Sequence, residues 1–251
     1  MSLTGRHALV TGGGRGIGRA IAAALKAQGA RVSILGRDEE ALRSACESGA
    51  ADAWAACDVR DEAAMATTMA NLAQEHPFDI VVANAGAVET GPFTRSDAAR
   101  FRRMLEINLI GTVNAFHAAL PDMIERRNGR LIAIASTAAQ RGYAYVSAYA
   151  AAKHAVLGLV RSLAMETART GVTVNAICPG YTDTDLVSGS VSAITAKTGL
   201  TSEEAVAQLV KDNPQGRLIA PEEVAAAVLY LCGAGSQPVT GQALSINGGE
   251  F

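Results

Sequence analysis

The stretch His7-Ala-Leu-Val-Thr11 runs directly into Gly12-Gly-Gly-Arg-Gly-Ile-Gly18. The apolar first part predicts a buried strand, and the glycines predict a tight turn that opens a helix from Gly16 to Gln28. Glycines let the backbone turn sharply and come close to an anion at the start of a helix. The spacing Gly-xxx-Gly-x-Gly differs from the common dinucleotide-binding pattern GxGxxG. An ordinary glycine-rich turn is therefore the alternative interpretation.

Short apolar runs alternate with longer Ala- and Leu-rich stretches from this segment to the end of the chain. Further strands are predicted at Arg31–Leu35, Ala53–Cys57, Asp79–Ala83, Arg130–Ala135, Val172–Ile177 and Ala243–Ile246. Further helices are predicted at Asp38–Glu47, Asp61–Glu75, Ala98–Arg126, Ser147–Thr170 and Ser202–Lys211. This alternation indicates βαβ units with right-handed connections. We predict an α/β protein of one domain over residues 1–251, with a doubly wound, Rossmann-like parallel sheet and helices on both faces.

Residues 185–217 interrupt this alternation between the last two predicted strands. They contain a Ser-, Gly- and Thr-rich stretch followed by the amphipathic helix Ser202–Lys211. An insertion at this point lies near the carboxyl edge of a parallel sheet, where ligands bind in such folds. We expect a mobile substrate lid, with a rigid insertion used for subunit contacts as the alternative.

Charge and hydropathy exclude several kinds of partner. The formal net charge is −2 and the basic residues form no block or stripe, so no nucleic-acid partner is expected. The longest apolar stretch, near Val224 to Cys232, is too short to span a bilayer. Met1 to Gly5 lacks a charged region followed by an apolar run, so no secretory signal is expected. We predict a cytoplasmic protein with no membrane association.

Cysteine and histidine spacings give no sign of a disulfide or metal framework. The four cysteines lie far apart and form no CxxC pair, so reduced, structural thiols are expected. The four histidines lack ligand spacing, and no metal site is predicted.

Tyr149 is followed by Lys153 four residues later, and residues at this spacing share one face of a helix. A free phenol has a pKa of about 10, and a nearby ammonium stabilises the phenolate and lowers that value. Ser136 ends a predicted strand beside this helix, where its hydroxyl could polarise a carbonyl oxygen. Tyr149 is therefore the candidate proton donor, although a core tyrosine, a surface lysine and a strand cap would also explain these residues singly.

Three motifs occur in a fixed order: TGxxxGxG from Thr11, Asn84-Ala-Gly86 after the fourth predicted strand, and Tyr149-xxx-Lys153 in a helix. With this order and spacing the chain resembles the short-chain dehydrogenase/reductase family over nearly its whole length. Further residues fall at matching places of the family pattern, namely Asp58, Asn108, Ser136, Pro179 and Gly180.

The resemblance implies roles for the matching residues. Ser136, Tyr149 and Lys153 would carry the chemistry, and Asn108 would kink its helix and hold a water that links Lys153 to solvent. Asp58 would flank the adenine. The cofactor-binding set that the resemblance and the glycine turn imply is Gly12, Arg15, Gly16, Ile17, Gly18, Arg37, Asp58, Val59, Asn84, Gly86, Tyr149, Lys153, Pro179, Gly180, Thr182 and Thr184.

The end of the second predicted strand bears on the choice of cofactor. An acid there would bind ribose hydroxyls and favour NAD, but the chain has Gly36 followed by Arg37. A guanidinium can pair bidentately with a 2′-phosphate, and Arg15 in the glycine turn is a second cation on the same side. In the resembling family this arginine pair accompanies NADP(H). Asp38 could meet the ribose instead, so NAD(H) stays open.

These features predict an NADP(H)-dependent oxidoreductase that interconverts a ketone and a secondary alcohol. Overall the chain resembles bacterial 3-oxoacyl-carrier-protein reductases and 3-hydroxyacyl-CoA dehydrogenases, which implies a small-molecule 3-oxoacyl thioester as substrate. A broad ketone, sugar or polyol dehydrogenase is the first alternative. A non-catalytic cofactor sensor is the second, and the intact set of Ser136, Tyr149 and Lys153 argues against it. The family pairs helices across subunits, which implies a homotetramer.

Overall fold

Within residues 2–251, which the computed structural model describes apart from the side chains of Leu186 and Ala193, seven strands form one sheet. Their order is β3-β2-β1-β4-β5-β6-β7, and every neighbouring pair runs parallel. The chain winds outward from β1 in both directions, so the predicted doubly wound sheet is confirmed. The strands are β1 (His7–Thr11), β2 (Arg31–Gly36), β3 (Ala53–Ala56), β4 (Ile80–Ala83), β5 (Gly129–Ile134), β6 (Val172–Pro179) and β7 (Ala243–Ile246).

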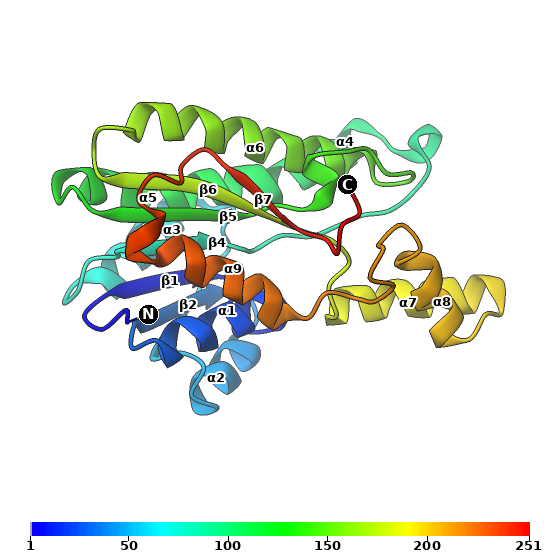
Figure 1. The fold of residues 1–251 in the computed structure, drawn as a ribbon, viewed down its shortest axis with the longest axis horizontal. Helices are drawn as coiled ribbons and strands as arrows, with labels where there is room; N and C mark the ends of the chain where they lie inside the picture. The colour runs from blue at the N-terminus through cyan, green and yellow to red at the C-terminus, as the bar shows by residue number, and fades with distance from the viewer. Residues whose placement is uncertain (1) are drawn as a thin grey trace.

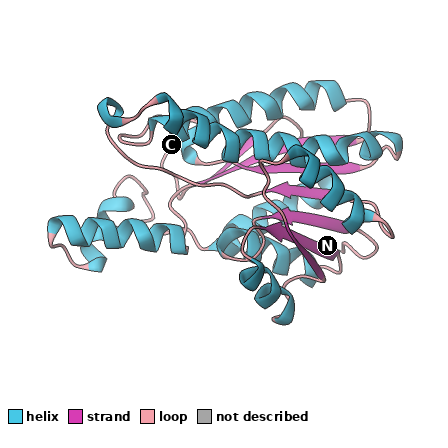
Figure 2. Ribbon diagram, turned by 180° about the vertical axis from the view of Figure 1, so that it is seen from behind, coloured by secondary structure: helices cyan, strands magenta, loops and turns pink. Residues whose placement is uncertain are grey.

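Helices cover both faces of the sheet (Figures 1 and 2). One face packs against α1 (Gly16–Ala27), α2 (Glu39–Glu47) and α9 (Pro221–Cys232). The other packs against α3 (Glu62–Ala73), α5 (Gly111–Glu125) and α6 (Ser147–Thr167). The remaining α-helices are α4 (Ala98–Leu105), α7 (Asp185–Thr198) and α8 (Ser202–Leu209).

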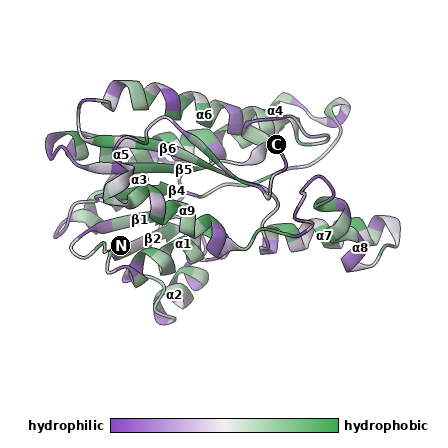
Figure 3. Cartoon of the chain, in the orientation of Figure 1, coloured by the Kyte–Doolittle hydropathy of each residue, from purple (hydrophilic) through white to green (hydrophobic). Residues whose placement is uncertain are grey.

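The strands are apolar on both sides because both faces of the sheet are buried. In β1, Ala8 and Val10 join the core beneath α1 and α9, whereas Leu9 joins the core beneath α5 and α6. Parallel strands covered on two faces carry continuous apolar runs rather than alternating ones. The hydrophobic colouring of the central strands follows from this burial (Figure 3).

The predicted helix Ala98–Arg126 is helical from Ala98 to Glu125, but a π-helical turn at Glu106–Ile110 divides it into α4 and α5. Asn108 lies in this turn, and its side-chain Nδ2 donates to the Met104 carbonyl at 3.0 Å. The Thr112 hydroxyl in turn donates to the Asn108 carbonyl at 2.9 Å. Side chains that bond to carbonyls four residues earlier disturb the regular helix, and such bulges are common at functional sites.

The Ser- and Thr-rich part of residues 185–217 is helical rather than irregular. Helix α7 ends at Gly199, whose φ of 74° suits a glycine, and Thr201 and Glu204 form a capping box that begins α8. The two helices project from the body of the molecule at the carboxyl end of the sheet (Figures 1 and 2).

The sequence pattern does not predict helix α9 (Pro221–Cys232), although the start of this helix carries helix signals. Pro221 occupies the first turn, and the Glu223 carboxylate accepts from the Ala220 N–H at 2.7 Å. The helix buries Val224 and Val228 against the sheet and α1. Its apolar residues are spread around the helix, so the periodicity that identifies a surface helix is weak.

Within residues 2–251 no helix combines the length and apolar character that a bilayer crossing requires. The cysteines are free thiols: Cys46 is partly buried, and Cys57, Cys178 and Cys232 are buried.

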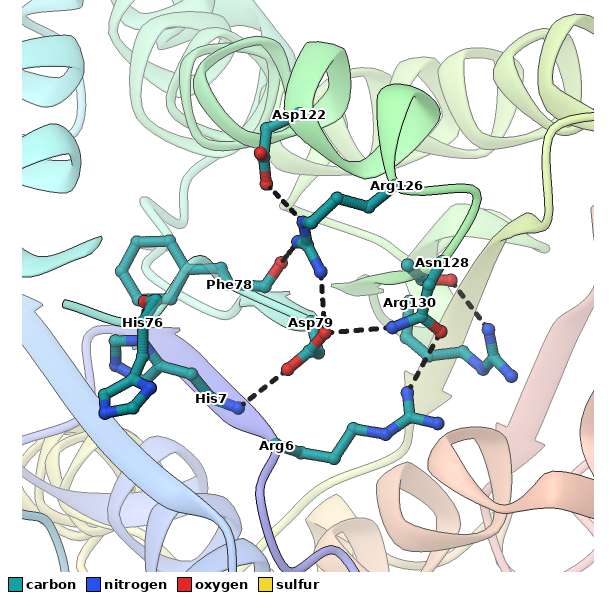
Figure 4. Close-up of polar contacts among 10 residues, drawn as sticks. Arg6, His7, His76, Phe78, Asp79, Asp122, Arg126, Asn128 and Arg130 are labelled. Atoms are coloured by element: carbon teal, nitrogen blue, oxygen red, sulfur yellow. Dashed lines mark hydrogen bonds and ion pairs between the residues drawn. The ribbon is translucent and has the colours of Figure 1, made fainter. Parts of the chain in front are cut away.

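Asp79 joins three segments at the amino end of the sheet, just before β4 (Figure 4). Its Oδ2 accepts from the His7 N–H at 3.0 Å. Its Oδ1 accepts from Arg126 Nη1 and from Asn128 Nδ2, each at 2.9 Å. The Asp79 side chain is 13% exposed, whereas Asp122, the other carboxylate on Arg126, is 51% exposed.

We predict that Asp79→Ala lowers the free energy of unfolding by about 2–4 kcal/mol, because it leaves the His7 N–H without its acceptor and takes from the Arg126 guanidinium the more buried of its two carboxylates. Asp122→Ala is the matched control, and an exposed ion pair contributes at most about 1 kcal/mol. Urea unfolding of both variants measures the difference. Equal losses in the two variants would contradict this account of Asp79.

Candidate active site

A cleft of about 810 Å³ lies along the carboxyl ends of the strands, at the switch point between β1 and β4. Segments that follow six neighbouring strands, from β3 to β6 in the sheet order, meet there, although they are far apart in the sequence. The predicted site residues that line it are Gly12, Arg15, Gly16, Ile17, Gly18, Arg37, Asp58, Val59, Asn84, Gly86, Asn108, Tyr149, Lys153 and Thr184.

The glycine turn fits tightly against the end of β4. Asn84 Nδ2 donates to the Thr11 carbonyl at 2.9 Å and to the Gly12 carbonyl at 3.2 Å. A Cβ on Gly18 would overlap the Gly12 carbonyl and the Asn84 amide, and Gly12 itself has a φ of 65°. The backbone of the turn and the start of α1 therefore form an open cradle of the kind that accepts a pyrophosphate.

Charged residues gather where the cleft passes β2 and β3. The Arg15 guanidinium pairs with Asp38, and Asp38 also accepts from the Ala41 N–H at 3.0 Å and so caps α2. The Asp58 carboxylate is held by Arg60, with Nη2 2.5 Å from Oδ2 and Nε 3.0 Å from Oδ1. These contacts lower the pKa of Asp38, chiefly through Ala41, and that of Asp58, chiefly through Arg60.

Arg37 lines this part of the cleft, and no hydrogen bond or salt bridge engages its guanidinium within the described residues. Arg15 pairs with Asp38 and Arg60 with Asp58, so Arg37 is the arginine at this end of the cleft that has no carboxylate in an ion pair with it among the described residues. A guanidinium without such a pair favours an additional phosphate over a bare ribose hydroxyl.

Tyr149 and Lys153 line the other end of the cleft, and Ser136, which does not line it, lies against Tyr149. Lys153 is only 5% exposed, and its Nζ lies 5.8 Å from the centre of the Tyr149 ring. The same Nζ donates to the Ile134 carbonyl at 2.8 Å. Ser136 follows β5, accepts from the Ala138 N–H at 3.1 Å, and faces the Tyr149 phenol.

The electrostatics of this group differ from the expectation drawn from the sequence. Burial raises the pKa of Tyr149 and outweighs the opposing effect of the Ser136 hydroxyl. Burial also lowers the pKa of Lys153 to about 8, because few groups compensate the buried ammonium. In the protein alone, Lys153 therefore does not make Tyr149 more acidic, since its ammonium bonds to a carbonyl instead.

Asn108 lies beneath this end of the cleft and is fully buried. Its Nδ2 donates to the Ala87 carbonyl at 2.9 Å, but its Oδ1 accepts no hydrogen bond from the described residues. A Cβ on Gly86 would lie 2.7 Å from that Oδ1 and 3.6 Å from Lys153 Nζ. The missing side chain of Gly86 thus leaves the Asn108 acceptor and the Lys153 donor facing one small space.

Pro179, Gly180 and Thr182 follow one another at and after the end of β6 and do not line the cleft, whereas Thr184 does. Pro179 ends β6, and the Gly180 N–H donates to the Ile246 carbonyl at 3.0 Å. Thr182 is buried, and its hydroxyl donates to the Gly180 carbonyl at 3.1 Å. Thr184 lies across from the glycine turn, with its methyl group 3.3 Å from the position that a Cβ on Gly16 would take.

Sequence reasoning missed several apolar lining residues, among them Ala41, Leu42, Val88 and Ile107. Each lies in a helix or loop whose pattern indicates burial only, so no local signal separates a cleft wall from the core. Leu42 even belongs to the main core cluster.

The fold and the cleft define a dinucleotide-binding α/β protein, and comparisons identify its relatives. The family described as enoyl-(acyl carrier protein) reductase matches residues 12–250. An acetoacetyl-CoA reductase of Shinella zoogloeoides is 38% identical over 250 residues, covering 98% of each chain. The 3-oxoacyl-(acyl-carrier-protein) reductase FabG of Salmonella typhimurium is 34% identical over 253 residues, covering 100% of this chain and 99% of its own.

A solved structure supports the same family assignment. A variant of actinorhodin polyketide ketoreductase, crystallised with NADPH, matches with a TM-score of 0.94 and 35% identity over 100% of this chain and 99% of its own. The chain belongs to the short-chain dehydrogenase/reductase family of oxidoreductases.

Proposed function

We propose that the protein is an NADP(H)-dependent reductase of 3-oxoacyl thioesters, which it converts to the 3-hydroxyacyl form. The observation that carries the proposal is that Ser136 lies against Tyr149, which lines one end of a dinucleotide-sized cleft together with buried Lys153. Relatives named for acetoacetyl-CoA and 3-oxoacyl reduction support the substrate class.

The cleft residues fit a nicotinamide dinucleotide, because the glycine cradle can take its pyrophosphate and Lys153 can reach its nicotinamide ribose. The bound cofactor would supply the hydride. Ser136 would hold the substrate oxygen, and Tyr149 would donate the proton to it. The raised pKa of Tyr149 keeps the phenol protonated at neutral pH, as carbonyl reduction requires. Lys153 loses its charge above pH about 8, so ribose binding and reduction should weaken there.

Asn108 completes the proposed proton path. Its Oδ1 can accept a hydrogen bond from a water that also contacts Lys153, and the space beside Gly86 lies between them. A proton lost by Tyr149 would then be replaced from solvent through Lys153.

Carbonyl reduction suits this site better than reduction of a carbon–carbon double bond, despite the name of the matching family. Two hydroxyl groups, those of Ser136 and Tyr149, face one point, and a carbonyl oxygen can accept from both. A kinetic screen with NADPH and NADH against acetoacetyl-CoA, crotonyl-CoA, simple ketones and polyols tests the assignment. Activity confined to crotonyl-CoA or to polyols would reject it.

We predict that Tyr149→Phe lowers kcat by about 10²- to 10⁴-fold, the usual contribution of a general acid. NADPH affinity should change little, because the phenyl ring keeps its shape in the cleft. Steady-state kinetics and fluorescence titration with NADPH measure the two quantities. Tyr230→Phe on α9, where the side chain is 56% exposed, is the control. Near-normal turnover of Tyr149→Phe would remove Tyr149 from the mechanism.

For the cofactor, we predict that Arg37→Asp weakens NADPH binding by roughly 10- to 100-fold and NADH binding far less, because a charge-assisted contact becomes a repulsion. Arg43→Asp makes the same charge change at an exposed position of α2 outside the cleft. Dissociation constants of NADPH and NADH, measured for wild type and both variants, test this prediction. Wild-type protein that already prefers NADH would show that Arg37 has another role.

For assembly, we propose a homotetramer with twofold interfaces. Met165 on α6 is 80% exposed and Tyr230 on α9 is 56% exposed, so apolar side chains stand on both helical layers. A tetramer of this symmetry needs two separate contact surfaces. Met165→Glu should yield dimers in analytical ultracentrifugation where the wild type sediments as a tetramer. A stable wild-type monomer at micromolar concentration would refute the proposal.

For residues 185–217, we propose a lid that closes over the substrate. Val187 is the one buried residue among the described side chains of α7, so few contacts hold this helix. Amide hydrogen exchange should be faster in α7 than in α6 and should slow when NADPH and acetoacetyl-CoA are added together. Slow exchange in α7 that ligands leave unchanged would indicate a rigid insertion.

A further inference from the structure

Glu250, the second-last residue, carries a carboxylate that is largely removed from water. Its side chain is 6% exposed, and its Oε1 accepts from the Tyr143 hydroxyl at 2.6 Å. Its Oε2 would lie 3.7 Å from a Cβ on Gly180, in the turn that follows β6. The C-terminal tail therefore packs against Tyr143 and the end of β6, where a buried carboxylate must have partners.

Tyr143 connects this carboxylate to the catalytic group. It lies in the loop between Ser136 and α6, and the Thr137 hydroxyl interacts with its phenol. Burial, and then the contact with Glu250, raises the pKa of Tyr143, so the phenol remains a hydrogen-bond donor at any working pH. Ser136 precedes Thr137 directly and faces Tyr149.

Arg141 extends the same cluster to the proposed lid. Its Nη1 lies 3.5 Å from Glu250 Oε1, and its Nη2 lies 3.8 Å from Asp212, just after α8. Its guanidinium also covers the rings of Tyr143 and Phe251, at 4.9 and 5.6 Å from their centres. The loop, the tail and the base of the lid are thus joined around one guanidinium.

We propose that Glu250 is a positioning residue of the reductase site, which braces Tyr143 and thereby holds Ser136 in line with Tyr149. The inference rests on the proposed function, because it assigns Ser136 and Tyr149 the carbonyl oxygen. Glu250, Tyr143 and Arg141 are not among the residues that line the cleft, so the brace does not touch the glycine turn that would hold the cofactor. Its loss should therefore lower catalysis without weakening NADPH binding.

The test is a double-mutant cycle of Glu250→Ala and Tyr143→Phe, with S-acetoacetyl-N-acetylcysteamine and NADPH as substrates. Each single variant should lose about tenfold in kcat, as expected when catalytic groups are misplaced rather than removed. The double variant should lose no more than either single one, because both break the same contact. Glu250→Gln keeps the acceptor for the Tyr143 hydroxyl and should restore most of the turnover.

Two readouts separate positioning from stability. The dissociation constant of NADPH should stay close to wild type in Tyr143→Phe and Glu250→Gln, and the thermal midpoint should stay close to wild type in Glu250→Gln. Glu75→Gln, which breaks the exposed 3.0 Å pair with Arg31, is the charge-matched control. Additive losses in the cycle, full turnover in Tyr143→Phe, or a loss of NADPH binding that parallels the loss of turnover would overturn the proposal. Wild-type protein inactive toward every 3-oxo compound would instead refute the proposed function.

Discussion

The backbone of the glycine turn reaches the end of β4 only because residue 18 has no side chain. The Asn84 amide then donates to two carbonyls of the adjoining strand and turn, which fixes the floor of the cleft at the switch point of the sheet. A larger side chain would separate β1 from β4 at their carboxyl ends. The cradle, the start of α1 and the wall formed by residues 84–88 all depend on this close approach.

Burial of polar groups shapes the opposite end of the cleft. Asn108 donates to a carbonyl of its own helix and stands in a π-helical turn, which places its amide beneath Gly86. Lys153 enters the same region, where its Nζ donates to the Ile134 carbonyl, and burial lowers the pKa of its ammonium to about 8. The pKa of Lys153 therefore lies close to the pH at which proton transfer has to occur, and such shifted pKa values are typical of catalytic sites.

Local pattern predicted the sheet, the glycine turn and the shared face of Tyr149 and Lys153, because strand alternation and helix spacing act over a few residues. The other features of the site depend on contacts between residues that are far apart in the sequence. Arg15 pairs with Asp38, 23 positions along the chain, and Tyr143 with Glu250, 107 positions along. The π-helical turn depends on the Ala87 carbonyl as well as on its own helix, and the apolar walls of the cleft have the same composition as the core.

Tyr143 and Tyr149 show how surroundings give one side chain two uses. Burial raises the pKa of both phenols. Tyr143 donates to a carboxylate, which makes removal of its proton harder still and suits a permanent contact. Tyr149 has a hydroxyl and an ammonium nearby and no carboxylate among the groups that shift its pKa. A cation bound in the cleft would therefore favour its phenolate, whereas the same cation would leave Tyr143 held by Glu250. In the proposed function Tyr149, rather than Tyr143, is therefore the phenol that would release and regain a proton during turnover.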